Sequence, residues 1–182
     1  MRSKEIIAIG LVLLMVSPVL FISSPQTSMA ANTVRWREVD PPAAKGMFIS
    51  QVCGDVNDDG HLDLIGGIKG LGVRVIAGDG DGSWTALGAI TTSGTYYGLD
   101  VGDVNHDGKL DVVAAEDGSG IYIWLGDGAG GWTLMEPPTV TGQFRSVALG
   151  DINHDGNTDI AAGSGEGDGL KVWTGDGAGI WV

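Results

Sequence analysis

The residues best suited to chemistry lie in three acidic stretches, GDVNDDGHLDL from Gly54, GDVNHDGKLDV from Gly102 and GDINHDGNTDI from Gly150. Counted from the first Asp, each stretch has Asp, Asn, Asp and Asp at positions 1, 3, 5 and 9, and a glycine at position 6. Carboxylates this close repel one another unless a cation lies between them. Because alternate side chains of a tight loop point toward a common centre, the pattern predicts a cation-binding loop.

Calcium is the cation that this set of donors favours. Ca²⁺ takes six to eight hard oxygen ligands, whereas Mg²⁺ prefers few protein ligands and several waters. Position 7 adds a backbone carbonyl to the side chains at positions 1, 3, 5 and 9. A solvated Asp-Gly turn would explain one copy, but three copies at a fixed period favour calcium. The predicted ligands are Asp55, Asn57, Asp59, His61 and Asp63; Asp103, Asn105, Asp107, Lys109 and Asp111; and Asp151, Asn153, Asp155, Asn157 and Asp159.

Other chemically capable residues recur with the loops and have simpler interpretations. The Gly-Asp-Gly turns are interpreted as hairpin turns rather than second metal sites, since Asp-Gly supplies the positive φ angles that tight turns require. The tryptophans that follow them are expected to pack between sheets rather than to bind sugars. The residues at position 4 of the loops are expected to point outward into solvent. These sets are Asp79, Asp127 and Asp176; Trp84, Trp132 and Trp181; and Asp58, His106 and His154.

The acidic loops belong to a longer repeat. Their first glycines are spaced by 48 residues, and a second signature follows each loop: GDGDGSW from Gly78, GDGAGGW from Gly126 and GDGAGIW from Gly175. Self-similarity at 40 to 50 residues is typical of propellers and solenoids. The sequence gives no sign of a helical period after the N-terminal segment.

Each repeat divides into four short strands separated by Gly-rich turns, as in GTYYGLDV, VVAA, IYIWL and WTLMEPPTV of the second copy. This pattern predicts an all-β fold, a β-propeller of four-stranded antiparallel blades. Small residues at Ser50, Gly98 and Ser146 fit an innermost strand crowded at the axis. The expected repeats span about 46–93, 94–141 and 142–182.

About three blades are expected, which makes a partial propeller or a fragment, because closed propellers usually have four to eight. The segment WREVDPP matches WTLMEPP two periods later, so residues 34–41 are expected to form an outer strand. Two explanations remain open: further blades beyond Val182, or a homo-oligomer that closes the ring.

The N-terminal segment has the pattern of a secretory signal peptide. Arg2 and Lys4 precede the apolar run Ile6–Ser23, and a polar stretch then ends in small residues at Ala30. Residues 1–30 are therefore expected to be removed, leaving 31–182 as the repeat region. The alternative is an uncleaved membrane anchor, and either reading predicts a secreted or cell-surface protein.

Charge and composition exclude some classes of partner. The net charge of −13 argues against nucleic-acid binding, which needs a basic face. Cys53 is the single cysteine, so no intramolecular disulfide can form, and it is expected to be a buried small hydrophobe. The sequence shows no nucleophile beside a base, no phosphate loop and no His pair with zinc-ligand spacing, so it predicts a protein that is not an enzyme.

The loop D-x-N-x-D-G-x-x-D, the apolar strand after it and G-D-G-x-G before an aromatic residue resemble the FG-GAP/VCBS repeats of integrin α-type β-propellers. An EF-hand or dockerin domain fits less well, since position 12 is Gly66, Ala114 or Ala162 instead of an acidic ligand. The resemblance covers Trp36 to Val182, although the literal Phe-Gly and Gly-Ala-Pro signatures are absent. It implies a Ca²⁺-bearing propeller of the kind found in cell-surface and secreted adhesion, lectin-like or carbohydrate-active proteins.

Two functions are consistent with these features. The first is a calcium-binding adhesion scaffold, secreted or on the cell surface, that binds a protein or carbohydrate ligand without catalysis. The second is the calcium-stabilised propeller portion of a larger extracellular lyase or hydrolase.

Overall fold

The computed structural model of the chain describes residues 44–167 and 169–182, all within one unit, Glu38–Val182. These residues form eleven strands in three antiparallel sheets, and no helix occurs among them. The expected signal peptide and the expected outer strand at 34–41 lie outside the described residues. No helix in the described part of the chain is long and apolar enough to cross a membrane.

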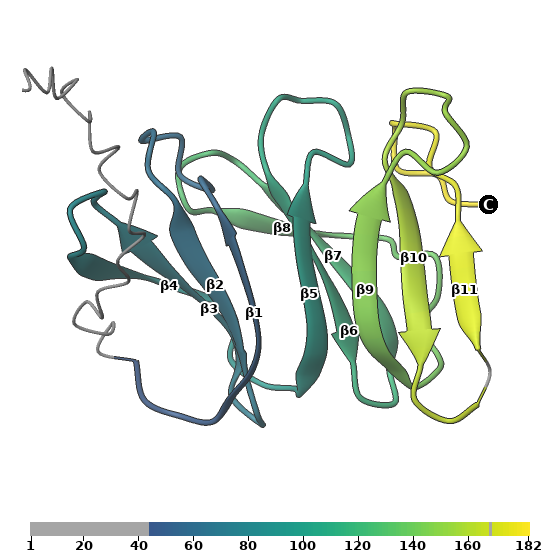
Figure 1. Cartoon of the computed structure of the whole chain (residues 1–182), viewed down its shortest axis with the longest axis horizontal. Coiled ribbons are helices and arrows are strands. Elements are labelled where there is room, and N and C mark those ends of the chain that lie inside the picture. The colour runs from purple at the N-terminus through teal and green to yellow at the C-terminus, as the bar shows by residue number, and fades with distance from the viewer. Residues whose placement is uncertain (1–43, 168) are drawn as a thin grey trace, which may run out of the picture. The chain divides into compact units, whose positions relative to one another are not determined.

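Each sheet falls within one sequence repeat and corresponds to one blade (Figure 1). Blade one has the order β1-β2-β3-β4 and blade two the order β5-β6-β7-β8, while blade three has the order β11-β10-β9. The all-β prediction is therefore confirmed, with sheets of three to four strands consistent with partial propeller blades. The strands are β1 (Phe48–Gly54), β2 (Asp63–Ile68), β3 (Gly72–Gly78), β4 (Trp84–Thr91), β5 (Tyr96–Gly102), β6 (Asp111–Glu116), β7 (Gly120–Gly126), β8 (Trp132–Met135), β9 (Phe144–Gly150), β10 (Asp159–Ser164) and β11 (Leu170–Trp173).

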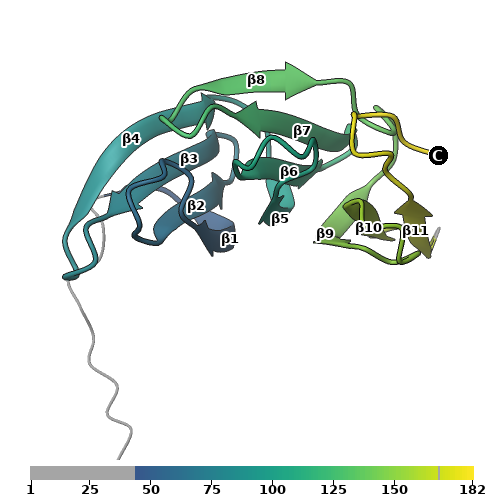
Figure 2. The same ribbon diagram turned by 90° about the horizontal axis from the view of Figure 1, so that it is seen from above.

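The blades are arranged with equivalent strands in equivalent places. Strands β1, β5 and β9 lie on the inner side in Figure 2, while β4 and β8 lie on the outer side. In blade three, Gly175 and Trp181 form an isolated antiparallel bridge. Gly126 and Trp132 make the equivalent pair in blade two, between β7 and β8.

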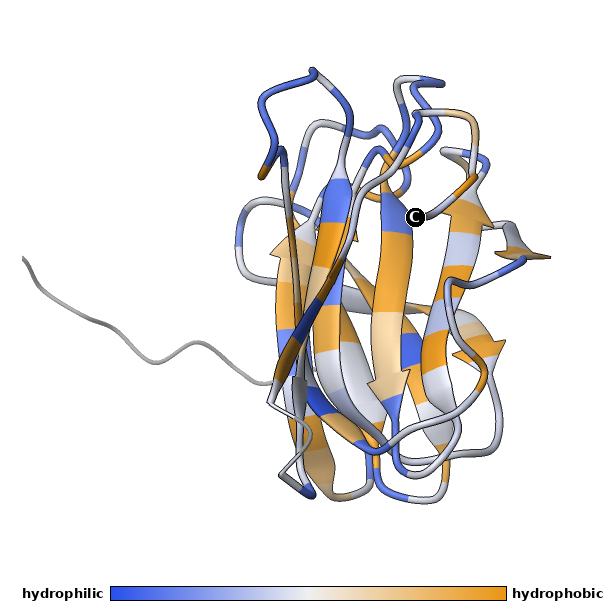
Figure 3. Ribbon diagram, turned by 90° about the vertical axis from the view of Figure 1, so that its right-hand side faces the viewer, coloured by the Kyte–Doolittle hydropathy of each residue, from blue (hydrophilic) through white to orange (hydrophobic). Residues whose placement is uncertain are grey.

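The core consists of two apolar layers, one between each pair of neighbouring blades. Short runs of β-branched and small residues make strands that are apolar on both faces, and burying those faces is the main favourable contribution to folding. In Figure 3 the apolar bands follow the strands and hydrophilic residues gather in the loops at their ends. The buried residues of the first layer are Val56, Ile65, Val73, Val75, Tyr96, Leu99, Val112, Ala114 and Trp124; those of the second are Val104, Val113, Ala115, Ile121, Ile123, Phe144, Ile160 and Ala162.

The tryptophans at the start of the outer strands contribute to this packing. Trp132 packs against the first layer and Trp181 against the second. The ring nitrogens of Trp84 and Trp181 are buried without a hydrogen-bond partner. These rings therefore serve as packing groups, in agreement with the interpretation made from the sequence.

The inner strands approach one another closely because their facing residues are small. Ser50 Oγ donates a hydrogen bond to the Tyr96 carbonyl across the first interface (2.6 Å). At the second interface, a Cβ added at Gly98 would lie 2.8 Å from Ser146 Cα and from the Val147 nitrogen. These are backbone atoms, so a side chain at Gly98 requires the two blades to separate.

We therefore expect Gly98→Ala to lower the free energy of unfolding by about 1–3 kcal/mol through overpacking, as measured by urea denaturation. Gly102→Ala is the matched control on the same strand. The nearest atom to its new Cβ is Leu149 Cδ1, the end of a flexible side chain, at 3.1 Å. Equal losses in the two variants would contradict the close approach of the inner strands.

Cys53 corrects one expectation, since its side chain is exposed rather than buried. Its equivalents Val101 and Leu149 each pack against the preceding blade. Cys53 projects from the same face of blade one, and no sheet covers that face among the described residues. The position is therefore partly buried where another blade precedes it.

Candidate metal sites

The three acidic loops connect the inner strand of each blade to its second strand: β1 to β2, β5 to β6 and β9 to β10. They lie at the same end of the three sheets, the upper end in Figure 1. The repeat thus presents the same loop three times along one edge of the molecule.

Within a loop, the side chains at positions 1, 3 and 5 turn inward onto the loop's own backbone. In the second loop the Asp103 carboxylate accepts hydrogen bonds from the Asp107 and Gly108 nitrogens, at 3.1 and 2.8 Å. Asn105 Oδ1 accepts from the same Asp107 nitrogen at 3.1 Å, and Asn105 Nδ2 donates to Asp107 Oδ2 at 3.2 Å. Asp107 Oδ1 accepts from the Lys109 nitrogen at 2.9 Å. The structure therefore gathers three of the predicted ligand side chains in one turn.

The first and third loops repeat these hydrogen bonds with nearly the same lengths. Their backbones repeat as well. The residues at position 4 adopt left-handed φ angles of 56° at Asp58, 59° at His106 and 63° at His154. Such angles are uncommon for residues other than glycine, so the shared bend shows that one loop conformation occurs three times.

The fourth predicted side chain, at position 9, occupies a different environment. Asp63, Asp111 and Asp159 are fully buried at the first residue of β2, β6 and β10. Asp111 Oδ2 accepts a hydrogen bond from the Val104 nitrogen and its Oδ1 from the Gly126 nitrogen, both at 2.9 Å. The other two loops have equivalent bonds. Position 9 therefore ties the loop to the end of the third strand, a role that the ligand pattern alone did not reveal.

In the described part of the chain, these buried carboxylates have no basic side chain as a partner. Within the described residues the only ion pair joins Arg145 to Asp117, with 3.4 Å between Nη2 and Oδ1. Burial raises the pKa of Asp63 and Asp111, and the other loop carboxylates add to the rise, while the backbone hydrogen bonds oppose it. Buried charges are ordinarily paired or bound to a metal, so a cation close to these carboxylates would favour their charged form.

The donors fit a hard cation better than a soft one. Each loop offers carboxylate oxygens, an amide oxygen and backbone carbonyls, and no sulfur or imidazole nitrogen is needed. Among the described residues, no three His, Cys, Asp or Glu side chains are gathered closely enough to form a metal centre by themselves. The predicted site also depends on the Asn side chain and on the carbonyl at position 7, so its full ligand set stays a prediction.

The Gly-Asp-Gly turns are built as self-contained hairpin turns. Asp127 Oδ1 accepts from the Ala129 and Gly131 nitrogens, both at 2.8 Å, and the Asp127 nitrogen donates to the Gly131 carbonyl. These hydrogen bonds lower the pKa of Asp127, and equivalent bonds lower that of Asp176. The aspartate oxygen accepts hydrogen bonds from the backbone nitrogens of its own turn, in keeping with the hairpin interpretation.

Two contacts between blades were not anticipated from the sequence. Asp100 Oδ2 accepts a hydrogen bond from the Leu149 nitrogen of the next blade at 2.8 Å. His106 is exposed, as expected at position 4, but it lies over the next Gly-Asp-Gly turn: a Cβ added at Gly177 would lie 2.9 Å from His106 Cδ2. No sequence motif predicts either contact, because each depends on how neighbouring blades pack against each other.

The sheets and loops together define a repeat protein built from propeller-type blades with an acidic loop in each. Two overlapping segments, 55–114 and 103–162, match the model of the FG-GAP-like repeat and together span more than half of the chain. The chain therefore belongs to the FG-GAP-like repeat family. None of the curated proteins compared with it matches.

Proposed function

We propose that this chain is a calcium-binding scaffold of the propeller type, secreted or held at the cell surface, which binds a protein or carbohydrate ligand without catalysing a reaction. The observation that carries the calcium assignment is the set of three fully buried aspartates, Asp63, Asp111 and Asp159, which have no ion-pair partner among the residues that the structure describes. A cation in each loop would balance these charges and the exposed carboxylates above them.

In this proposal Asp103, Asn105, Asp107 and the Lys109 carbonyl would hold the ion in the second loop, with Asp111 beneath it. The bound ion would supply positive charge and oxygen coordination and nothing else. The side chains keep the loop in its bend, since positions 1, 3 and 5 already accept hydrogen bonds from its backbone. Carboxylates held in this way are poorly placed to act as acid and base, which supports a binding role.

An extracellular location, which the N-terminal sequence predicts, would suit the same function. Calcium modules outside cells bind with Kd of roughly 10⁻⁴ to 10⁻³ M. The N-terminal sequence up to Ala30 has the organisation of a secretory signal peptide. Export would place the loops in a medium with enough free Ca²⁺ to occupy sites of this affinity.

We expect isothermal titration calorimetry to give three calcium ions per chain. Asp107→Ala should remove one site and leave two, because the loops are separate and each has its own ligands. Glu166→Ala is the matched control, since it removes an exposed carboxylate outside the loops and should leave three. The absence of binding at millimolar Ca²⁺ would contradict the proposal.

A further inference from the structure

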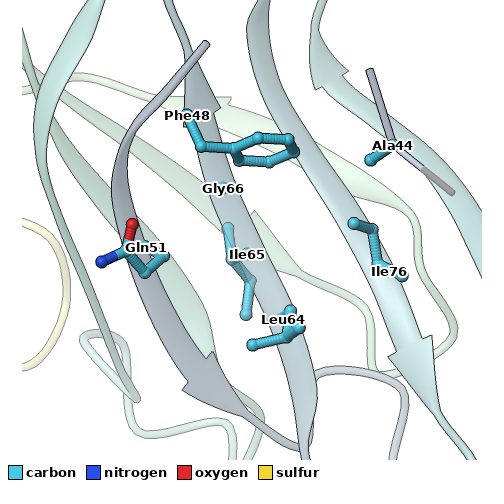
Figure 4. A pocket seen from close by; sticks show the side chains of 7 residues that line it. All are labelled: Ala44, Phe48, Gln51, Leu64, Ile65, Gly66 and Ile76. Carbon is cyan, nitrogen blue, oxygen red and sulfur yellow. The ribbon is translucent and has the colours of Figure 1, made fainter. Parts of the chain in front are cut away.

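Neighbouring blades contact each other at two interfaces in the described part of the chain. The exposed face of blade one instead carries an open cavity of about 290 Å³, lined by Phe48, Gln51, Leu64, Ile76 and their neighbours (Figure 4). No sheet covers this cavity among the described residues. At the interface between blades two and three both partners are present, and there the acidic loop of one blade is hydrogen-bonded to the acidic loop of the next.

The bond comes from Thr158, at position 8 of the third loop. Its Oγ1 donates a hydrogen bond to the backbone carbonyl of Asp103 at 3.0 Å, and the bond is partly buried. Asp103 is the residue at position 1 of the second loop, and its carboxylate is one of the predicted ligands. A side chain of blade three therefore holds the residue that begins the loop of blade two.

The carbonyl that Thr158 contacts belongs to a peptide group that makes a second hydrogen bond. This peptide joins Asp103 to Val104, and the Val104 nitrogen donates to Asp111 Oδ2 at 2.9 Å. Because a peptide group is planar, its carbonyl and its N–H are oriented together. A hydrogen bond accepted by the carbonyl also polarises the N–H and strengthens the bond that the N–H donates. Thr158 thus acts on the ligands at positions 1 and 9 of the second loop.

A second contact joins the same two loops. A Cβ added at Gly177 would lie 2.9 Å from His106 Cδ2 and 2.6 Å from Asn157 Oδ1. The ring of His106, at position 4 of the second loop, and the amide of Asn157, at position 7 of the third, therefore lie against the same Gly-Asp-Gly turn. The two loops are held together at two points, each beside predicted ligands.

The first interface has an equivalent contact without the hydroxyl. Position 8 of the second loop is Leu110, and its Cδ1 would lie 2.9 Å from a Cβ added at Gly54, the residue before Asp55. Leucine has no hydroxyl, so it cannot donate to the Asp55 carbonyl. The first loop is therefore an internal control, because it lacks the bond that the second loop receives from the next blade.

We propose that Thr158 is a positioning residue for the calcium site of the second loop, so that calcium binding there and the packing of blade three on blade two strengthen each other. The inference rests on the proposed calcium function. Binding requires Asp103 and Asp111 to hold fixed positions, and the Thr158 bond supplies part of that order before the ion binds. By reciprocity, a bond that raises the affinity for calcium is itself strengthened when calcium is bound.

Isothermal titration of Ca²⁺ into full chains with one remaining site tests the proposal. Asp55→Asn with Asp151→Asn leaves the second site, and Asp103→Asn with Asp151→Asn leaves the first. In the second-site chain, Thr158→Val should weaken calcium binding about two- to tenfold, the equivalent of one hydrogen bond. In the first-site chain the same substitution should leave the affinity unchanged. Thr158→Ser keeps the hydroxyl and should retain most of the affinity of the second site.

The outcomes distinguish this inference from the proposed function. If the second-site chain binds Ca²⁺ equally well with and without Thr158→Val, the positioning role is wrong while the calcium function stands. Equal weakening in the first-site chain would show that the substitution acts through the whole fold, which also overturns the positioning role. If neither chain binds Ca²⁺ with Thr158 in place, the proposed function and this inference are both wrong.

Urea denaturation of the chain with all three loops intact gives a second measurement. Thr158→Val should lower the midpoint urea concentration more in Ca²⁺ than in EDTA, because the coupling between the bond and the ion is reciprocal. Thr133→Val, at an exposed position on β8, is the matched control and should shift the midpoint equally in both solutions. An equal shift for Thr158→Val in Ca²⁺ and in EDTA would overturn the coupling.

Discussion

Replacing Asp111 with alanine is expected to lower the free energy of unfolding by about 2–6 kcal/mol, measured by urea denaturation in the presence of a chelator. The substitution leaves the Val104 and Gly126 nitrogens, which now donate to the carboxylate, buried without acceptors. Each unsatisfied buried donor costs about 1–3 kcal/mol. Removing a buried charge offsets part of this cost, so we expect a loss in the lower half of this range.

Asp107→Ala is the matched control, because Asp107 is exposed in the same loop and accepts a hydrogen bond from an exposed nitrogen. Its change in chelator should stay below about 1 kcal/mol. Asp111→Asn separates charge from shape: it fills the same volume but turns an amide group toward one of the two donors. If Asp111→Ala unfolds at the same urea concentration as the parent chain, the buried carboxylate does not fix the loop.

The repeat made the strands and loops predictable. Three copies at a spacing of 48 residues marked where each strand lies relative to Gly54, Gly102 and Gly150. A strand's position in the repeat is a local property, set by turn residues and by short apolar runs. Such features can therefore be predicted from the sequence.

The dual role of position 9 could not be predicted in the same way. Spacing placed Asp63, Asp111 and Asp159 among the ligands, and the structure adds that they are fully buried at the start of a strand. Their second hydrogen-bond donor lies fifteen or sixteen residues further along the chain, at the end of the third strand. Only the pairing of the strands brings that donor to the carboxylate.

Burial at equivalent positions was the least predictable property. Cys53, Val101 and Leu149 occupy one place in the repeat, yet the first is exposed and the others are packed against a preceding blade. Reasoning from a repeat assumes that every copy has a neighbour on both sides. The assumption fails for the first and last sheets described.

The hydrogen bonds of the loops indicate what a cation would change. Positions 1, 3 and 5 are already oriented by the backbone, so binding requires little reorganisation of the loop. The main unfavourable contribution to the stability of the cation-free loops is repulsion between their carboxylates, because the loops hold ten of the 23 acidic residues of the chain. Calcium is therefore expected to act mainly on stability.

Removal of calcium with EDTA is accordingly expected to lower the melting temperature by roughly 6–24 °C. At a few millimolar free Ca²⁺ and a Kd of roughly 10⁻⁴ to 10⁻³ M, each site adds about 1–2 kcal/mol by linkage. Three sites together add roughly 3–6 kcal/mol, comparable with the 5–15 kcal/mol that stabilises a typical domain. A change of 1 kcal/mol shifts the melting temperature by about 2–4 °C at this chain length.

Differential scanning calorimetry with and without EDTA measures the shift. Adding back Ca²⁺ should restore the melting temperature, while the same concentration of Mg²⁺ should restore less, because Mg²⁺ requires a smaller octahedral site. A variant with Asp103, Asp151 and Asp55 all changed to asparagine is the control, and its melting temperature should be insensitive to EDTA. If the parent chain melts at the same temperature in EDTA and in Ca²⁺, the buried aspartates are balanced by their backbone hydrogen bonds alone and calcium does not stabilise the blades.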